Sequence, residues 1–168
     1  MKSLAGDGRA QTEMKDVPTR QVVVWLEKRA LASRWASHEW RVAAVLPPGA
    51  PAPVVGAVAV DGLTASLYAD EAEGYYLNAS SATPVAFVMS RPPETGEDAE
   101  APPQPRFVTL SYNEAARLLD AQERVDSVPL EAGLAAWLAD YVAANYRPEP
   151  KKRRVKASFL SPDQRSRL

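Results

Sequence analysis

Proline sets the strongest limit on how this chain can fold. The sequence has 15 prolines, while its hydrophobic (46%) and charged (24%) fractions are ordinary for a soluble globular protein. Each proline costs about 3 kcal/mol in a helix interior, so helices are confined to the stretches that lack it. Most of the prolines fall in three clusters that mark loops or tails, namely Pro47–Pro53, Pro92–Pro105 and Pro148–Pro150.

Proline also argues against a membrane-spanning helix. Val42–Val60 runs for nineteen residues without a charge, but it contains four prolines. We therefore predict two strands joined by a proline-rich loop in this segment. Residues 1–19 carry Asp7, Glu13 and Asp16 and no apolar run, which predicts a disordered leader without a signal peptide. A cytoplasmic protein with no membrane association is expected.

The numbers of cysteines and histidines and the distribution of charge along the chain exclude several kinds of functional site. With no cysteine and one histidine, the chain cannot form a disulfide, a thiolate nucleophile, a zinc knuckle or a multi-histidine metal site. Residues 147–168 hold eight basic and two acidic residues, net +6, which leaves 12 basic and 19 acidic residues, net −7, in residues 1–146. An acidic body disfavours nucleic-acid binding and places any anion binding in the tail.

The first two thirds of the chain have the pattern of strands. Asp61-Gly62 is typical of a two-residue type I′ turn and predicts a hairpin. In the segment Trp40–Leu46 the side chains should alternate between the two faces of a strand, with Trp40, Val42, Ala44 and Leu46 on the inward face. The predicted strands are Gln21–Leu26, Trp40–Leu46, Val54–Val60, Leu63–Tyr68, Tyr75–Ala79, Val85–Met89 and Phe107–Leu110, with the fifth and sixth forming a second hairpin. The acidic, proline-rich residues 91–106 predict an exposed, mobile loop.

Helical patterns follow the last predicted strand. Ser111 and Glu114 form a capping box, which predicts a helix that ends near Ala121. Pro129 suits the first turn of a second helix, which Pro148 should end. Leu130, Leu134, Trp137, Leu138, Tyr141 and Val142 share one face of this helix.

Strands followed by helices predict an α+β fold. We expect one domain over residues 20–146. Its six or seven antiparallel strands should form a strongly curved or barrel-like sheet, with the C-terminal helices packed against it.

The candidate binding residues lie between the first two predicted strands and at the start of the second. Arg34–Arg41 holds two of the four tryptophans and the only histidine, and Arg34, Trp35, His38, Trp40 and Arg41 are candidates for contact with a ligand or partner. Ser37-His38-Glu39 resembles a catalytic triad, but adjacent residues point in different directions and cannot form the required chain of hydrogen bonds. Buried rings with snorkelling basic residues are the structural alternative. No catalytic residue is predicted.

Two charged segments have alternative interpretations. Asp70, Glu71 and Glu73 lack the alternating ligands of a calcium loop, which favours a solvated acidic turn over a metal site. Residues 147–168 form a basic tail, predicted to be disordered, that either keeps the protein soluble or docks an acidic partner. Its candidate docking residues are Lys151, Lys152, Arg153, Arg154, Lys156 and Phe159.

Four segments carry a family resemblance. Arg34–Leu46, Glu71–Ser80, Val108–Arg117 and Tyr146–Lys152 resemble an uncharacterised bacterial family described as a domain of unknown function. The resemblance covers residues 21–159. Members of that family are encoded beside molybdenum-dependent formate dehydrogenases and their maturation factors, and some are labelled molybdopterin-guanine dinucleotide biosynthesis proteins.

The resemblance implies a role near formate dehydrogenase, and the residues argue against the nucleotidyltransferase label. Such an enzyme has a glycine-rich phosphate loop after its first strand, whereas Glu27–Ser33 contains no glycine. We expect a non-enzymatic accessory protein, without a cofactor, that contacts a formate dehydrogenase subunit or a maturation factor. The alternative is a domain that binds a small anion, a pterin or the molybdenum cofactor.

Overall fold

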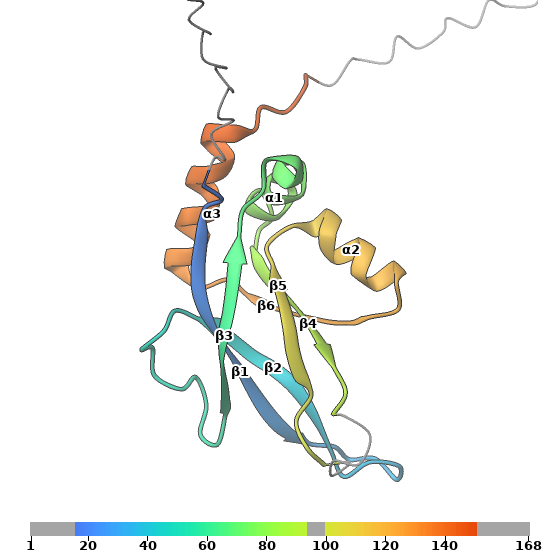
Figure 1. Ribbon diagram of the computed structural model, residues 1–168. Coiled ribbons are helices and arrows are strands. Elements are labelled where there is room, and N and C mark those ends of the chain that lie inside the picture. The colour runs from blue at the N-terminus through green and yellow to red at the C-terminus, as the bar shows by residue number, and fades with distance from the viewer. Residues whose placement is uncertain (1–15, 94–99, 151–168) are drawn as a thin grey trace, which may run out of the picture.

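The two halves of the structure are three-stranded antiparallel sheets, with helical segments after the first sheet, one helix between two strands of the second and one helix after it (Figure 1). The computed structural model describes residues 16–93 and 100–150. An α+β fold is confirmed. The elements of the described residues are β1 (Thr19–Ala30), β2 (His38–Leu46), β3 (Val58–Ser66), η1 (Ala69–Glu71), α1 (Ala72–Ala79), β4 (Val85–Arg91), β5 (Gln104–Thr109), α2 (Tyr112–Asp120), β6 (Arg124–Pro129) and α3 (Ala132–Asn145).

The first sheet has the order β2-β1-β3, with the most apolar strand in the centre. Val22, Val24 and Leu26 of β1 are almost fully buried. The predicted inward face of β2 is wrong in part, because the register slips by one residue at Ala43. This β-bulge places Val42 and Val45 in the core, in place of a regular alternation from Trp40 to Leu46.

The predicted hairpin at Asp61-Gly62 is wrong. Both residues lie inside β3, which pairs with β1 along its whole length. Val23 of β1 stands opposite two residues of β3, and Gly62 has a φ of 83°. Glycine therefore supplies the positive φ that a bulge requires, and the strand continues past it.

The second sheet has the order β5-β4-β6. The strands predicted over Val85–Met89 and Phe107–Leu110 correspond to β4 and β5. Strand β6 was not predicted, and Pro129, which was predicted to start a helix, is its last residue. The predicted loop is shorter than residues 91–106, since β4 ends at Arg91 and β5 starts at Gln104. Residues 94–99 of the predicted mobile loop lie outside the described residues.

The predicted strongly curved or barrel-like sheet is also wrong, because the six strands form two open sheets. Strand β3 lies against β5, and β2 lies against β6, but neither pair forms a hydrogen-bonded ladder. At the first of these seams both strands are bulged, β3 at Asp61-Gly62 and β5 at Arg106. These bulges interrupt the β1–β3 and β4–β5 ladders and bend both strands beside the seam.

Tyr75–Ala79 is helical, so the strand predicted there is wrong and no hairpin joins it to β4. Asn78 of α1 is fully buried, and its side-chain amide is bonded to backbone groups that lie outside the helix. It donates to the carbonyls of Val85 (2.7 Å) and Leu110 (2.8 Å) and accepts from the Val85 amide (2.9 Å). Helix α1 is thereby fixed to the start of β4 and the end of β5.

Helix α3 covers the first sheet with the face that the sequence predicts. Leu134, Leu138 and Val142 are buried in the core that both sheets share. The guanidinium of Arg20 lies 4.9 Å from the ring centre of Trp137, a cation–π contact between β1 and α3. In the part of the chain that the structure describes, no helix is both long and apolar enough to cross a membrane.

Candidate functional site

The candidate residues Arg34 and Trp35 lie at the tip of the β1–β2 hairpin. The amide of Leu31 donates to the carbonyl of Ser37 (3.0 Å), which closes the loop. Inside it, the amide of Trp35 donates to the hydroxyl of Ser33 (3.2 Å). The Trp35 side chain is 94% exposed, so the predicted burial of this ring is wrong.

His38 and Arg41 have partners within the same hairpin. The Ser37 hydroxyl lies 2.9 Å from Nδ1 of His38, but among the described contacts none joins this ring to a carboxylate. Arg41 forms an ion pair with Glu27, the residue opposite it on β1. The structure therefore does not gather the five candidate residues into one site.

Trp40 lies at a different surface, in a cavity of about 340 Å³. His38, Trp40 and Arg124 line it together with Pro92 and Pro103. The indole of Trp40 donates to the carbonyl of Glu100 (2.8 Å), and Arg124 of β6 donates to the carbonyl of Trp40. Lys28 also pairs with Glu100 (3.1 Å). These contacts attach the β4–β5 connection to the hairpin.

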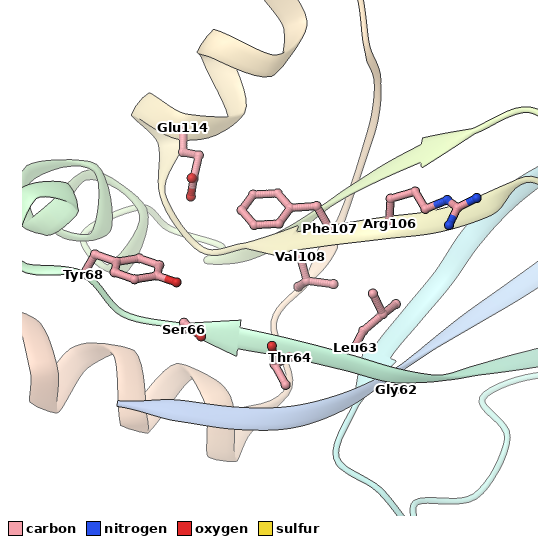
Figure 2. Close-up of a pocket in the computed structure, with 9 residues that line it drawn as sticks. All are labelled: Gly62, Leu63, Thr64, Ser66, Tyr68, Arg106, Phe107, Val108 and Glu114. Atoms are coloured by element: carbon pink, nitrogen blue, oxygen red, sulfur yellow. The ribbon is translucent and has the colours of Figure 1, made fainter. Parts of the chain in front are cut away.

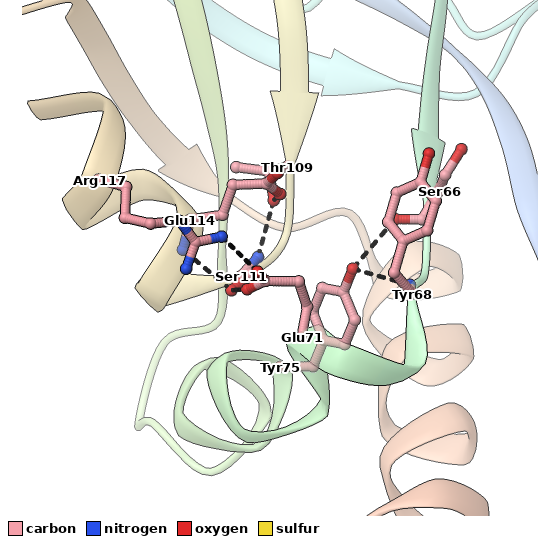
Figure 3. A network of polar contacts seen from close by, with 8 residues as sticks. All are labelled: Ser66, Tyr68, Glu71, Tyr75, Thr109, Ser111, Glu114 and Arg117. Atoms are coloured by element: carbon pink, nitrogen blue, oxygen red, sulfur yellow. Dashed lines mark hydrogen bonds and ion pairs between the residues drawn. The ribbon is translucent and has the colours of Figure 1, made fainter. Parts of the chain in front are cut away.

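A polar network that the sequence analysis did not assemble lies between α1 and α2 (Figure 3). The buried Ser111 hydroxyl accepts from the Glu114 amide (3.1 Å) and donates to the Glu71 carboxylate (2.6 Å). Glu71 also pairs with Arg117, so the turn at Asp70–Glu73 is not simply solvated as predicted. In a capping box the Glu114 carboxylate would accept directly from the Ser111 amide. Here the Thr109 hydroxyl lies between these two groups, since it donates to Glu114 (2.5 Å) and accepts from the Ser111 amide (3.1 Å).

Tyr75 extends this polar region toward the first sheet. Its hydroxyl accepts from the Tyr68 amide (3.1 Å) and donates to the Ser66 carbonyl (3.2 Å). Burial raises the pKa of the Tyr75 hydroxyl above its ordinary value, which keeps the group protonated. Its ring packs edge-on against Tyr141, with 5.8 Å between the ring centres. A protonated tyrosine with both bonds satisfied stabilises the fold and is a poor acid or base.

A cavity of about 190 Å³ occupies the bulged seam between β3 and β5 (Figure 2). Thr64, Ser66 and Tyr68 line one side, and Arg106 and Glu114 line the other. Glu114 is engaged with Thr109, and Arg106 with Gln104. The single histidine of the chain lies in the hairpin, so no imidazole is available to activate a hydroxyl here. In the described residues, no group of three or more histidine, aspartate or glutamate side chains is placed to hold a metal ion.

A comparison with protein families shows to which family the chain belongs. A family described as "Protein of unknown function (DUF3305)" matches residues 21–155. The chain belongs to this family. The description of DUF3305 names no activity, cofactor or partner. No curated protein and no solved structure matches the chain.

The remaining predicted site residues of this DUF3305 protein lie outside the described residues. They are the tail residues Lys151, Lys152, Arg153, Arg154, Lys156 and Phe159. Residues 1–15 of the predicted leader lie outside them as well, whereas Thr19 already belongs to β1. The polar network had only one local signal, the Ser111–Glu114 capping box. Its other half, Glu71, comes from 40 residues earlier, a distance at which sequence spacing predicts nothing.

Proposed function

We propose that this DUF3305 protein is a non-catalytic adaptor that binds a protein partner through the tip of its β1–β2 hairpin. The observation that carries the proposal is Trp35, which is 94% exposed on a loop closed by its own hydrogen bonds. Tryptophan and arginine are the residues most enriched in interface hot spots, and Trp35 follows Arg34 directly. A ring held out on a short loop loses little entropy when a partner covers it.

The partner we propose is a subunit or a maturation factor of a molybdenum-dependent formate dehydrogenase. This part rests on the resemblance of Arg34–Leu46, Glu71–Ser80, Val108–Arg117 and Tyr146–Lys152 to a family encoded beside such enzymes. The first of these segments contains the hairpin tip. Trp35, the exposed tryptophan of the proposed adaptor, therefore lies in one of the segments on which the resemblance rests.

Affinity purification of the tagged full-length protein from its native cells tests the proposal. Trp35→Ala should reduce recovery of the dehydrogenase or maturation factor on the order of 30-fold, since hot-spot truncations cost about 2 kcal/mol or more. Val55→Ala is the matched control, because Val55 is another fully exposed apolar residue, in the β2–β3 connection away from the hairpin tip (Figure 1). If neither protein co-purifies at physiological salt, or Trp35→Ala recovers as much as Val55→Ala, the proposal is wrong.

The cavity beside Trp40 supports a second candidate, the binding of a small anion or pterin. His38 and Trp40 offer rings to stack on, and Arg124 offers a positive charge, although it already pairs with Asp126 (3.1 Å) and donates to the carbonyl of Trp40. Neither Arg34 nor Arg41 lines this cavity. A thermal-shift screen with molybdate, pterins and nucleotides separates the candidates. A ligand at about 100 times its dissociation constant stabilises the fold by about 2.7 kcal/mol. The adaptor proposal predicts no shift, and a shift that Trp40→Ala abolishes would favour the ligand.

A further inference from the structure

A groove with apolar walls and an acidic rim lies at the end of the molecule where α3 finishes. It encloses about 430 Å³, and its lining includes Val17, Leu67, Tyr68 and Tyr141 together with the carboxylates of Asp16 and Asp70. Leu67 is buried and forms part of its wall, while Val17 and Tyr68 are each more than 40% exposed. Its volume is within the range of about 300–1,000 Å³ that is usual for ligand pockets.

The acidic groups of this groove are not held in ion pairs in the described part of the chain, although the charge of Asp70 adds to the hydrogen bond with Glu71 in raising the pKa of the Arg117 guanidinium. Among the described residues, no ion pair involves Asp16 or Asp70. The charge of Asp70 also acts on Tyr141, where it adds to burial in raising the pKa of the hydroxyl above its ordinary value. An occupant with an apolar side chain beside positive charge would fit both features of the groove.

The C-terminal residues of the chain have this composition. Residues 147–168 carry eight basic and two acidic residues, net +6, and Phe159 is their only aromatic residue. By contrast, residues 1–15 carry three basic and two acidic residues, net +1, and no aromatic residue. Charge complementarity therefore selects the C-terminal segment over the N-terminal one.

The connection between groove and segment is short. Asn145 of α3 lines the groove, and Phe159 follows it by 14 residues, which span at most about 50 Å when extended. A tether of this length gives an effective concentration in the millimolar range, so weak contacts suffice for docking. Both ends of the described chain also lie at this end of the molecule (Figure 1).

We propose that the C-terminal segment docks on its own domain, with Phe159 in the groove and the basic run Lys151–Lys156 against the carboxylates of Asp16 and Asp70. This contact is independent of the hairpin tip, which lies at the opposite end of the first sheet (Figure 1). It covers the exposed faces of Val17 and Tyr68 and neutralises two carboxylates. An acidic partner has to displace the segment before it can bind the basic run.

Paramagnetic relaxation in the full-length protein tests the docking. Because the chain has no cysteine, Ser161→Cys introduces a unique thiol for a nitroxide label. We expect the amide signals of Leu67–Asp70 and Tyr141–Asn145 to lose most of their intensity, independently of protein concentration. A label at Ser37→Cys, on the hairpin tip, is the matched control and should leave these signals intact.

Two variants distinguish docking of the segment in the groove from the proximity that its covalent connection to α3 would cause without docking. Phe159→Ser keeps the tether and the label but should restore most of the groove signals. Asp70→Asn should restore them in part, as should 1 M salt, which shortens the Debye length from about 10 Å at 0.1 M to about 3 Å. Groove signals that are unaffected by the label, or equally weak with Phe159→Ser, would overturn the proposal. Loss of signal that grows with concentration would show docking on a second copy and overturn it as well.

Discussion

At the scale of single residues, Gly74 and Ser111 control how α1 packs on α2. A Cβ atom at Gly74 would lie 2.0 Å from the Ser111 hydroxyl and 3.1 Å from the Asn113 amide nitrogen. Ser111 is fully buried and bonded on both sides, so it has no room to move away. Glycine is therefore required here by close approach, although it is a poor helix residue.

Gly74→Ala should consequently lower the free energy of unfolding by about 1–3 kcal/mol, since overpacking outweighs the gain in helix propensity. Urea unfolding of the full-length protein measures the change. Gly133→Ala is the control, because the atom nearest to its added Cβ is a side-chain oxygen of Glu131 at 3.1 Å, without the 2.0 Å clash found at Gly74. That substitution should be neutral or stabilise the protein by up to about 1 kcal/mol. Equal stability of the two variants would contradict the steric argument.

At the scale of elements, the strand β3 shows how a turn signal can be overruled. Asp61-Gly62 has the local chemistry of a tight turn, and Gly62 does take a positive φ. Seven residues of β3 pair with β1 on both sides of this point, which is a larger gain than a two-stranded hairpin on its own would provide. The same glycine therefore forms a bulge, because the partner strand is long enough to bind both halves.

Helix α3 begins with a carboxylate cap that makes its stability depend on pH. Glu131 accepts from the Leu134 amide (3.0 Å), and its bonds to the Gly133 and Leu134 amides lower the pKa of the carboxyl below its ordinary value. A lowered pKa in the folded state means that stabilisation is complete above the unfolded pKa of about 4.3. It is lost as the pH falls through the lower, folded pKa.

Glu131→Gln should therefore reduce stability at neutral pH by less than about 1 kcal/mol and flatten the stability profile below about pH 4. Thermal unfolding of the full-length protein from pH 2 to pH 7 provides the measurement. Asp140→Asn, which removes an exposed carboxylate from the same helix, should leave the profile as it is in the parent. Parallel profiles for Glu131→Gln and the parent would show that the cap contributes nothing.

At the scale of the whole molecule, one core joins the two sheets. Val24 and Leu26 of the first sheet, Val88 and Val108 of the second and Leu138 of α3 belong to the same buried cluster. No hydrogen-bonded ladder connects the sheets in the described residues, so side-chain packing has to carry the cooperativity.

Leu138→Ala should for that reason destabilise the entire fold by about 2–5 kcal/mol in a single transition. Circular dichroism and tryptophan fluorescence should report the same midpoint in urea. Leu119→Ala, on the exposed side of α2, should change stability by no more than about 0.5 kcal/mol. Two separated transitions would mean that each sheet unfolds on its own.

Features that depend on neighbours along the chain could be predicted from the amino-acid pattern alone. The apolar cores of β1, β2, β4 and β5, the capped start of α2 and the buried face of α3 all follow from local patterns of hydrophobicity and capping. The location of the candidate hairpin tip between the first two strands also follows from the order of the segments. These features are set by interactions over a few residues, which spacing predicts well.

Features that depend on partners elsewhere in the fold could not be predicted in this way. Tyr75–Ala79 is helical, with Asn78 bonded to Val85 and Leu110, and Asp61-Gly62 is a bulge because β1 continues beside it. The exposure of Trp35, the pairing of Glu71 with Ser111 and the two open seams have the same origin. Asn78 and Leu110 are 32 residues apart, and Glu71 and Ser111 are 40 residues apart. Local preferences of about 1 kcal/mol give way to such contacts.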